Sequence, residues 1–196
     1  MNVRITVCRA AGLAGVVAAI SGLGLSAGAS AATTPSAAAA VRVQPATAVP
    51  PPTGGTVTCA IQSNNGDFLS AVGGGGRTAD PVIRTDATQI RSWETFTLVP
   101  VGDGVHYGIR TINGNFLTAV GGGGRITDVI HSDATWLRAW EEFTFVPLTP
   151  TGPYGIETIN GHFLTSVGDG GRAANAIHSD ATRIQSWEMF WPICGI

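Results

Sequence analysis

Hydrophobic and polar residues alternate in short segments through most of the chain after residue 55. These segments are rich in β-branched or aromatic residues and are bounded by Gly, Asn, Asp or Pro, as at 107–112, 116–120, 129–132 and 143–146. Such a pattern predicts short β-strands. No stretch after residue 31 shows the period of an amphipathic helix over a useful length. The chain is therefore expected to form an all-β domain.

This hydrophobic pattern occurs three times. Residues 113–147 read NGNFLTAVGGGGRITDVIHSDATWLRAWEEFTFVP, and closely related sequences precede and follow this segment. An interval of 47 residues separates the equivalent tryptophans Trp93, Trp140 and Trp187. A period of this length is typical of repeat architectures, in which each unit completes its core against its neighbours. The predicted domain covers residues 56–196, with units at about 56–103, 104–151 and 152–196.

Each unit is expected to contribute about four strands, giving about twelve in all. An Asn-Gly pair in each unit, at 65, 113 and 160, supplies the positive φ of a two-residue primed hairpin turn. A three-bladed propeller falls below the usual blade count, and an open sheet leaves its edges unpaired. The predicted fold is therefore a β-trefoil with pseudo-threefold symmetry, a six-stranded barrel capped by three hairpins.

Residues present in all three units are expected to build the frame. The repeated Phe-Leu pairs, and the tryptophans with the phenylalanines three residues later, are predicted to be core. For the triplicated tryptophans, stacking against a sugar ring is the alternative. The glycine runs at 73–76, 121–124 and 168–171 lack the Lys and Ser/Thr of a phosphate loop, so they are interpreted as hairpin connections. The arginines that end these runs are predicted to pair with the glutamates that follow the tryptophans: Arg77, Arg125, Arg172 with Glu94, Glu141, Glu188.

The first 55 residues differ in composition from the domain. Residues 1–31 combine Arg4 and Arg9, an apolar run and a small-x-small site, which together predict a secretory signal peptide. Residues 32–55 are rich in Ala, Thr and Pro and predict an extended linker. The protein is accordingly expected to be secreted and extracellular, without membrane insertion once the signal is cleaved.

Three cysteines are present, and one of them, Cys8, lies in the predicted signal peptide. The remaining pair, Cys59 and Cys194, lies in the first and last predicted strands. An even number of cysteines in an exported domain favours a disulfide. We predict a Cys59–Cys194 bridge, with two buried thiols as the alternative.

Two combinations of residues resemble known trefoil families. The repeated Asn-Gly-x-Phe-Leu, the glycine run and the Trp-Glu-x-Phe resemble the fascin-like, or actin-crosslinking, β-trefoil domain over residues 56–196, of which this chain would be a secreted single-domain member. That resemblance implies filamentous actin as a partner. The Gln-x-Trp signature of ricin-type lectin trefoils appears once, at 185–187, and it implies carbohydrate binding.

Composition argues against several functions. The chain has 11 Lys plus Arg against 13 Asp plus Glu, and all of the basic residues are arginine. A mildly acidic protein without lysine is a poor binder of phosphate backbones, so nucleic acid is not an expected partner. Acids and bases repeated in three equivalent environments do not give the divergent pKa values that catalysis needs. We expect no enzyme activity, no cofactor and no metal site.

Residues that break the threefold pattern are the best candidates for binding. Trp136 stands where the sister units have Gln89 and Arg183, so it is predicted to be exposed. A tryptophan on the surface offers a platform for a sugar ring, and nearby polar residues can bond hydroxyl groups. The predicted ligand site consists of Trp136 with His131, Asp133 and Arg138.

The leading functional hypothesis is therefore a secreted, non-enzymatic, lectin-like module that binds an extracellular or cell-wall polysaccharide or glycan. Actin-filament binding or crosslinking, implied by the fascin-like resemblance, is the alternative. Protease inhibition is a third hypothesis, and it needs a projecting loop, for which the connections 101–106 and 148–153 are the candidates.

Overall fold

The computed structural model describes residues 54–196, so the predicted signal peptide and nearly all of the predicted linker lie outside the described residues. The described part contains twelve strands and six short 3-10 turns. None of its helical segments is long and apolar enough to cross a membrane. The strands are β1 (Val57–Ser63), β2 (Phe68–Ala71), β3 (Ile83–Ala87), β4 (Phe96–Pro100), β5 (His106–Arg110), β6 (Phe116–Ala119), β7 (Ile130–Ala134), β8 (Glu142–Pro147), β9 (Tyr154–Thr158), β10 (Phe163–Ser166), β11 (Ile177–Ala181) and β12 (Phe190–Cys194). The 3-10 turns are η1 (Val72–Gly74), η2 (Ser92–Glu94), η3 (Val120–Gly122), η4 (Ala139–Glu141), η5 (Val167–Asp169) and η6 (Ser186–Glu188).

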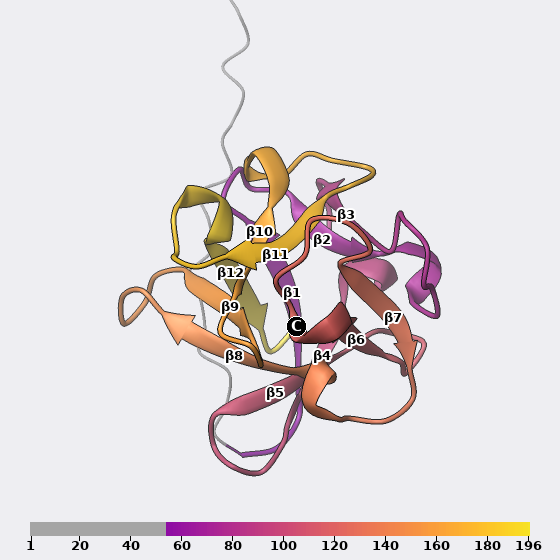
Figure 1. Cartoon of the computed structure of the whole chain (residues 1–196), viewed down its shortest axis with the longest axis vertical. Coiled ribbons are helices and arrows are strands. Elements are labelled where there is room, and N and C mark those ends of the chain that lie inside the picture. Colours follow the sequence, from indigo (N-terminus) through magenta and orange to yellow (C-terminus); the bar gives the residue numbers. More distant parts are fainter. Residues whose placement is uncertain (1–53) are drawn as a thin grey trace, which may run out of the picture. The chain divides into compact units, whose positions relative to one another are not determined.

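Six of the strands close into a barrel. The pairing runs β1, β4, β5, β8, β9, β12 and back to β1, and every pair is antiparallel. The first and last strands of the domain pair from Cys59 opposite Cys194 to Ser63 opposite Phe190. Figure 1 shows the C-terminus beside β1 in the middle of the domain. Closure in this way leaves the barrel without an unpaired edge.

The other six strands form three hairpins, β2–β3, β6–β7 and β10–β11. Each hairpin is attached to a barrel strand through its first member, at β1, β5 and β9 respectively. All three show a register shift at the same place, after the first paired residue. A six-stranded barrel with three equivalent hairpins is a β-trefoil, which confirms the predicted fold.

The core is built from the residues that repeat at the start of the closing barrel strands. Phe96, Phe143 and Phe190 are completely buried, as predicted. The leucines of the Phe-Leu pairs are each 2% exposed, at Leu69, Leu117 and Leu164. Burying an aromatic side chain of this size stabilises the fold by roughly 3 kcal/mol, so these threefold positions supply much of the driving force for closure.

The glycine runs join each unit to the next. Asn113 donates hydrogen bonds from its backbone N–H to the carbonyl of Gly74 and from Nδ2 to the carbonyl of Gly73. Asn160 makes the same two bonds to Gly122 and Gly121. Between the third unit and the first, the backbone N–H of Asn65 donates to the carbonyl of Asp169, which lies in the run at 168–171. The predicted hairpin connections are therefore also the seams between units.

The Asn-Gly turns differ from the prediction. Gly66, Gly114 and Gly161 have φ of 98°, 89° and 78°, but none of the preceding asparagines is among the described residues with positive φ. A type I′ turn needs positive φ at both positions, so the two-residue primed turn was wrong. The backbone N–H of Gly66 donates to Ser63, and that of Ser63 donates to Asp67, which closes a three-residue loop with a single left-handed glycine. The asparagines keep negative φ, and the side chains of Asn113 and Asn160 bond to the neighbouring glycine runs.

The predicted disulfide is present. Cys59 and Cys194 are joined across paired positions of β1 and β12, with their Cα atoms 4.0 Å apart. The bridge connects the first unit to the third at the point where the barrel closes.

Candidate binding site

Three equivalent segments lead from the outer hairpin strands back to the barrel. They cover residues 86–94, 133–141 and 180–188, and we call them the first, second and third tryptophan loops. Each begins at the end of β3, β7 or β11 and finishes in the 3-10 turn η2, η4 or η6, directly before β4, β8 or β12. Every loop contains an aspartate, an Ala-Thr pair, a long polar or aromatic residue and a tryptophan.

The tryptophans of these loops are on the surface. Trp93, Trp140 and Trp187 are 45%, 50% and 46% exposed, so their predicted place in the core was wrong. Each lies at the centre of its 3-10 turn, and it is the following glutamate that is buried. Because the phenylalanines two residues after these glutamates already fill the barrel, the indole has no core position left. Three large aromatic side chains are therefore held at equivalent exposed sites.

A buried glutamate fixes each turn. Glu141 is 6% exposed and accepts hydrogen bonds from the backbone N–H of Arg138, at 3.1 Å, and from Oγ1 of Thr118, at 2.7 Å. Glu188 and Glu94 cap their turns in the same way. Hydrogen bonds to a carboxylate are stronger than neutral ones, so the loops are pre-organised.

The predicted pairing between the arginines and these glutamates was wrong. Arg125 bonds the carbonyl of Thr127 and the carboxylate of Asp128 instead. Arg172 bonds the carbonyl of Ala174. The glutamates accept bonds within their own loops and hairpins because that arrangement satisfies the N–H group at the start of each 3-10 turn.

A second anchor lies beneath two of the loops. A Cβ built at Gly108 would meet the side chain of Leu137 at 2.8 Å, and one built at Gly155 would meet Ile184 at 2.5 Å. Leu137 and Ile184 therefore pack directly on the barrel backbone at glycines that leave room for them. The residues on either side of Leu137 in the second loop, Trp136 and Arg138, are both exposed.

The third loop is hollowed. A cavity of about 390 Å³ is lined by residues of the segment 180–188, with Asp180, Arg183, Gln185 and Trp187 among them. The aspartate supplies hydrogen-bond acceptors, the arginine and the amide supply donors, and the indole supplies an apolar face. The Gln-x-Trp signature at 185–187 thus lies inside this hollow.

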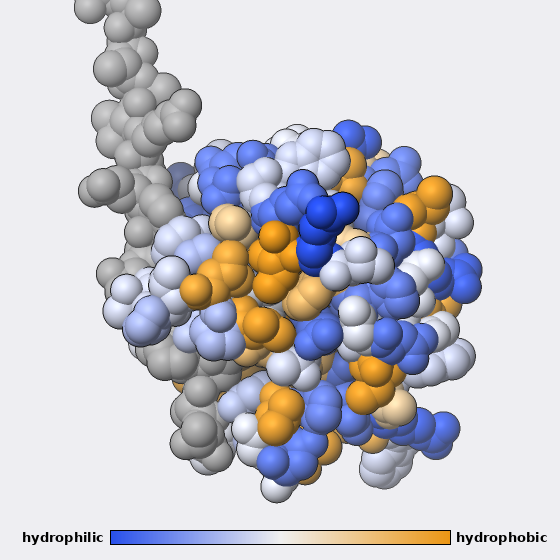
Figure 2. All heavy atoms as spheres, turned by 60° about the vertical axis from the view of Figure 1, so that its left-hand side comes forward, coloured by the Kyte–Doolittle hydropathy of each residue, from blue (hydrophilic) through white to orange (hydrophobic). Residues whose placement is uncertain are grey.

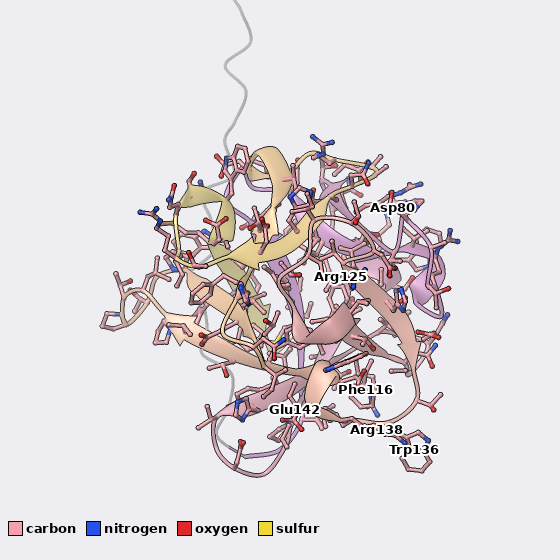
Figure 3. All side chains as sticks on the ribbon, in the orientation of Figure 1. Asp80, Phe116, Arg125, Trp136, Arg138 and Glu142 are labelled. Atoms are coloured by element: carbon pink, nitrogen blue, oxygen red, sulfur yellow. A yellow bond between two sulfur atoms is a disulfide. The ribbon has the colours of Figure 1, made fainter. Side chains whose placement is uncertain are left out.

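The structure brings three of the four predicted site residues into one loop. Trp136 is 73% exposed, as predicted, and Figure 3 shows it and Arg138 at the periphery of the domain. Asp133 is also exposed, at the end of β7. His131 lies further back on β7, where its Nε2 is 2.7 Å from Oδ1 of Asp128. The histidine is therefore engaged with Asp128, outside the second tryptophan loop.

From sequence, the triplicated tryptophans were assigned to the core, with sugar stacking as the alternative, and the structure places them on the surface. One signal was available: each unit already offers a buried phenylalanine three residues after its tryptophan, which leaves the aromatic content of the core complete without the indole.

Other exposed hydrophobic side chains also reach the surface. On the face shown in Figure 2 the largest hydrophobic group lies left of centre, and smaller groups are separated from it by hydrophilic residues.

The connection 101–106 is held by hydrogen bonds between its own residues. Oδ1 of Asp103 accepts hydrogen bonds from the backbone N–H groups of Val105 and His106, and Oδ2 is 2.5 Å from Nδ1 of His106. These bonds, chiefly the one from the His106 side chain, hold the pKa of Asp103 well below its usual range. Protease inhibition through this connection stays a prediction.

Within residues 54–196, His, Cys, Asp and Glu form no group of three or more that could hold a metal ion.

The fold is shared with several solved structures. ThreeFoil, a designed threefold-symmetric protein, matches with a TM-score of 0.59 at 12% identity over 69% of this chain and 97% of its own. The Rhizoctonia solani agglutinin matches with a TM-score of 0.54 at 12% identity over 74% of this chain and 99% of its own. SeviL bound to asialo-GM1 saccharide matches with a TM-score of 0.52 at 12% identity over 72% and 100%.

These likenesses establish the fold alone. No family model matches the chain, and no curated protein matches it either. The fascin-like resemblance and the actin partner that it implies therefore stay predictions from sequence.

Proposed function

We propose that the protein is a lectin-like module whose three tryptophan loops bind carbohydrate. The observation that carries the proposal is the exposure of Trp93, Trp140 and Trp187, which are about half accessible in identical, rigid turns. An exposed indole does little for the stability of the core. Its repetition in three units is more economically explained by contact with a ligand.

The chemistry around each indole suits a sugar. A pyranose ring has an apolar face that packs on an aromatic ring and a rim of hydroxyl groups that need donors and acceptors. Every loop supplies one aspartate and at least one arginine beside its tryptophan. In the third loop these groups line a hollow of about 390 Å³. Because the glutamate caps hold the loops in place, a ligand would lose little affinity to loop ordering.

Two further observations support the proposal. The fold is shared with an agglutinin and with a protein solved as a saccharide complex. The disulfide agrees with the export that residues 1–31 predict. We therefore propose that the ligand is an extracellular or cell-wall glycan. Three individually weak sites would bind it together with a higher overall affinity than any one of them alone.

The test is glycan binding by the purified protein and by the triple variant Trp93→Ala/Trp140→Ala/Trp187→Ala. The triple variant is expected to stay folded and to lose at least about tenfold in affinity, which corresponds to about 1.4 kcal/mol. The matched control is Ile112→Ala/Ile159→Ala, which removes exposed apolar side chains outside the loops and is expected to bind normally. Equal binding by the triple variant and the wild type would contradict the proposal.

Actin binding rests on the resemblance alone. Cosedimentation with filamentous actin at physiological salt, together with the absence of any bound glycan, would replace the lectin-like proposal with the fascin-like one.

A further inference from the structure

We infer that the second tryptophan loop is the dominant site and binds consecutive rings of an uncharged polysaccharide, whereas the third loop takes a single ring. This inference rests on the proposed function. It adds the chemical class of the ligand and states which loop binds several sugar rings and which binds one.

The second loop alone contains two exposed indoles. Trp136 is 73% exposed and Trp140 is 50% exposed, and they are four positions apart in the chain. The first and third loops have Gln89 and Arg183 at the position of Trp136. Figure 3 shows Trp136 extending away from the body of the domain. Two aromatic surfaces in one short loop provide contacts for more than one sugar ring.

The two indoles stand on a fixed base. Between them, Leu137 packs over Gly108 of the barrel, and the backbone N–H of Arg138 is held by the buried carboxylate of Glu141. A loop whose backbone is already anchored adds little ordering cost when a ligand binds. The backbone that carries Trp136 and Trp140 is therefore pre-organised.

The charges favour an uncharged ligand. The second loop and the first residue of β8 hold Asp133, Glu141 and Glu142 against one cation, Arg138. Since Glu141 is buried and each of its carboxylate oxygens accepts a hydrogen bond from the protein, the surface presents Asp133, Arg138 and the half-buried Glu142. Such a surface offers hydroxyl groups both acceptors and donors but repels uronic acids and sulfate groups.

The third loop differs in shape. Arg183 takes the place of the projecting indole, and the loop lines an open hollow of about 390 Å³ that Trp187 borders. A concave site with a single aromatic surface holds one sugar ring, whereas the projecting indole of Trp136 leaves space for a chain to continue on both sides.

The test measures affinity for uncharged soluble polysaccharides and for oligosaccharides of one to six units cut from the one that binds best. For the wild type, affinity is expected to rise at least tenfold between the monosaccharide and the trisaccharide. In Trp136→Gln, which introduces the residue of the first loop, that gain is expected to fall to less than threefold. Trp187→Ala is expected to lower binding of the monosaccharide while the gain with chain length persists.

A loss of binding can also result from a variant that fails to fold, whereas a gain of affinity cannot. Arg183→Trp gives the third loop the second indole, and it is expected to raise affinity for the polysaccharide several-fold in the Trp136→Gln background. An anionic polysaccharide of similar length is expected to bind at least tenfold more weakly than the uncharged one at low salt.

The two proposals fail in different ways. Binding that is lost in the triple tryptophan variant but unchanged in Trp136→Gln, or a stronger preference for the anionic chain, would overturn this inference and leave the proposed function intact. Absence of binding to every glycan, or full binding by the triple variant, would overturn both.

Discussion

Replacing both disulfide cysteines, in the variant Cys59→Ser/Cys194→Ser, is expected to lower the free energy of unfolding by about 5 kcal/mol. The bridge spans 135 residues of sequence, so it constrains nearly the whole domain in the unfolded state. A loss of this size is a large fraction of the stability of a typical domain. The expected fall in the midpoint of thermal unfolding is about 15 °C.

Thermal and denaturant unfolding followed by circular dichroism would measure the effect. Cys59 is completely buried, so serine at this position could destabilise the fold by itself. The control is wild-type protein with a reductant, which should unfold at nearly the same midpoint as the double variant. A bridge-free protein within about 1 kcal/mol of the wild type would show that the barrel closes without covalent help.

The variant Gly123→Ala is expected to cost about 4 kcal/mol, through two effects that add. Gly123 has φ 107° and ψ −173°, a conformation that essentially only glycine adopts. Holding an alanine in this conformation costs about 1–3 kcal/mol. A Cβ at this position would also collide with the side chain of Thr158 in the next unit. Relieving such a clash in a packed seam costs about 1–3 kcal/mol.

A matched control lies two residues away. Gly121 also has positive φ, at 70°, but a Cβ there would meet nothing closer than 3.9 Å. Gly121→Ala is therefore expected to cost only about 1 kcal/mol, the usual penalty for a left-handed residue with a side chain. Equal losses of unfolding free energy for the two variants would show that contact with the next unit is not what requires the glycine run.

The fold could be predicted from the sequence because the evidence for it is repeated. Three copies of one strand pattern are too few for a propeller, and an open sheet would leave its edges exposed. The trefoil is the closed arrangement that remains. The pairing of Cys59 with Cys194 followed from the same reasoning, since the first and last strands of a closed barrel are neighbours.

The candidate site was harder to predict because repetition does not separate core from surface. Phe143 and Trp140 recur with equal regularity, yet one is completely buried and the other is half exposed. What separates them is the 3-10 turn, which directs Glu141 inward to cap the backbone and leaves the indole outside. The inward position of the glutamate depends on hydrogen bonds to residues far away in the sequence, such as the bond that Thr118 of β6 donates to Glu141.

Residues that break the symmetry were a better guide to exposure. Trp136 was expected on the surface because its sister residues are Gln89 and Arg183, and it is the most exposed large hydrophobic residue among those described. His131 was predicted to belong to the same site, but on β7 its side chain contacts Asp128 instead.

The central claim is that the tryptophan loops contact a glycan, and nuclear magnetic resonance of the indole N–H groups tests it most directly. The chain has five tryptophans, of which four lie in the loops, while Trp191 packs against the core. On addition of an uncharged polysaccharide to the labelled protein, the indole signals of Trp93, Trp136, Trp140 and Trp187 are expected to shift, and that of Trp191 is expected to stay in place. Indole signals that all remain fixed while backbone signals elsewhere move would contradict the account.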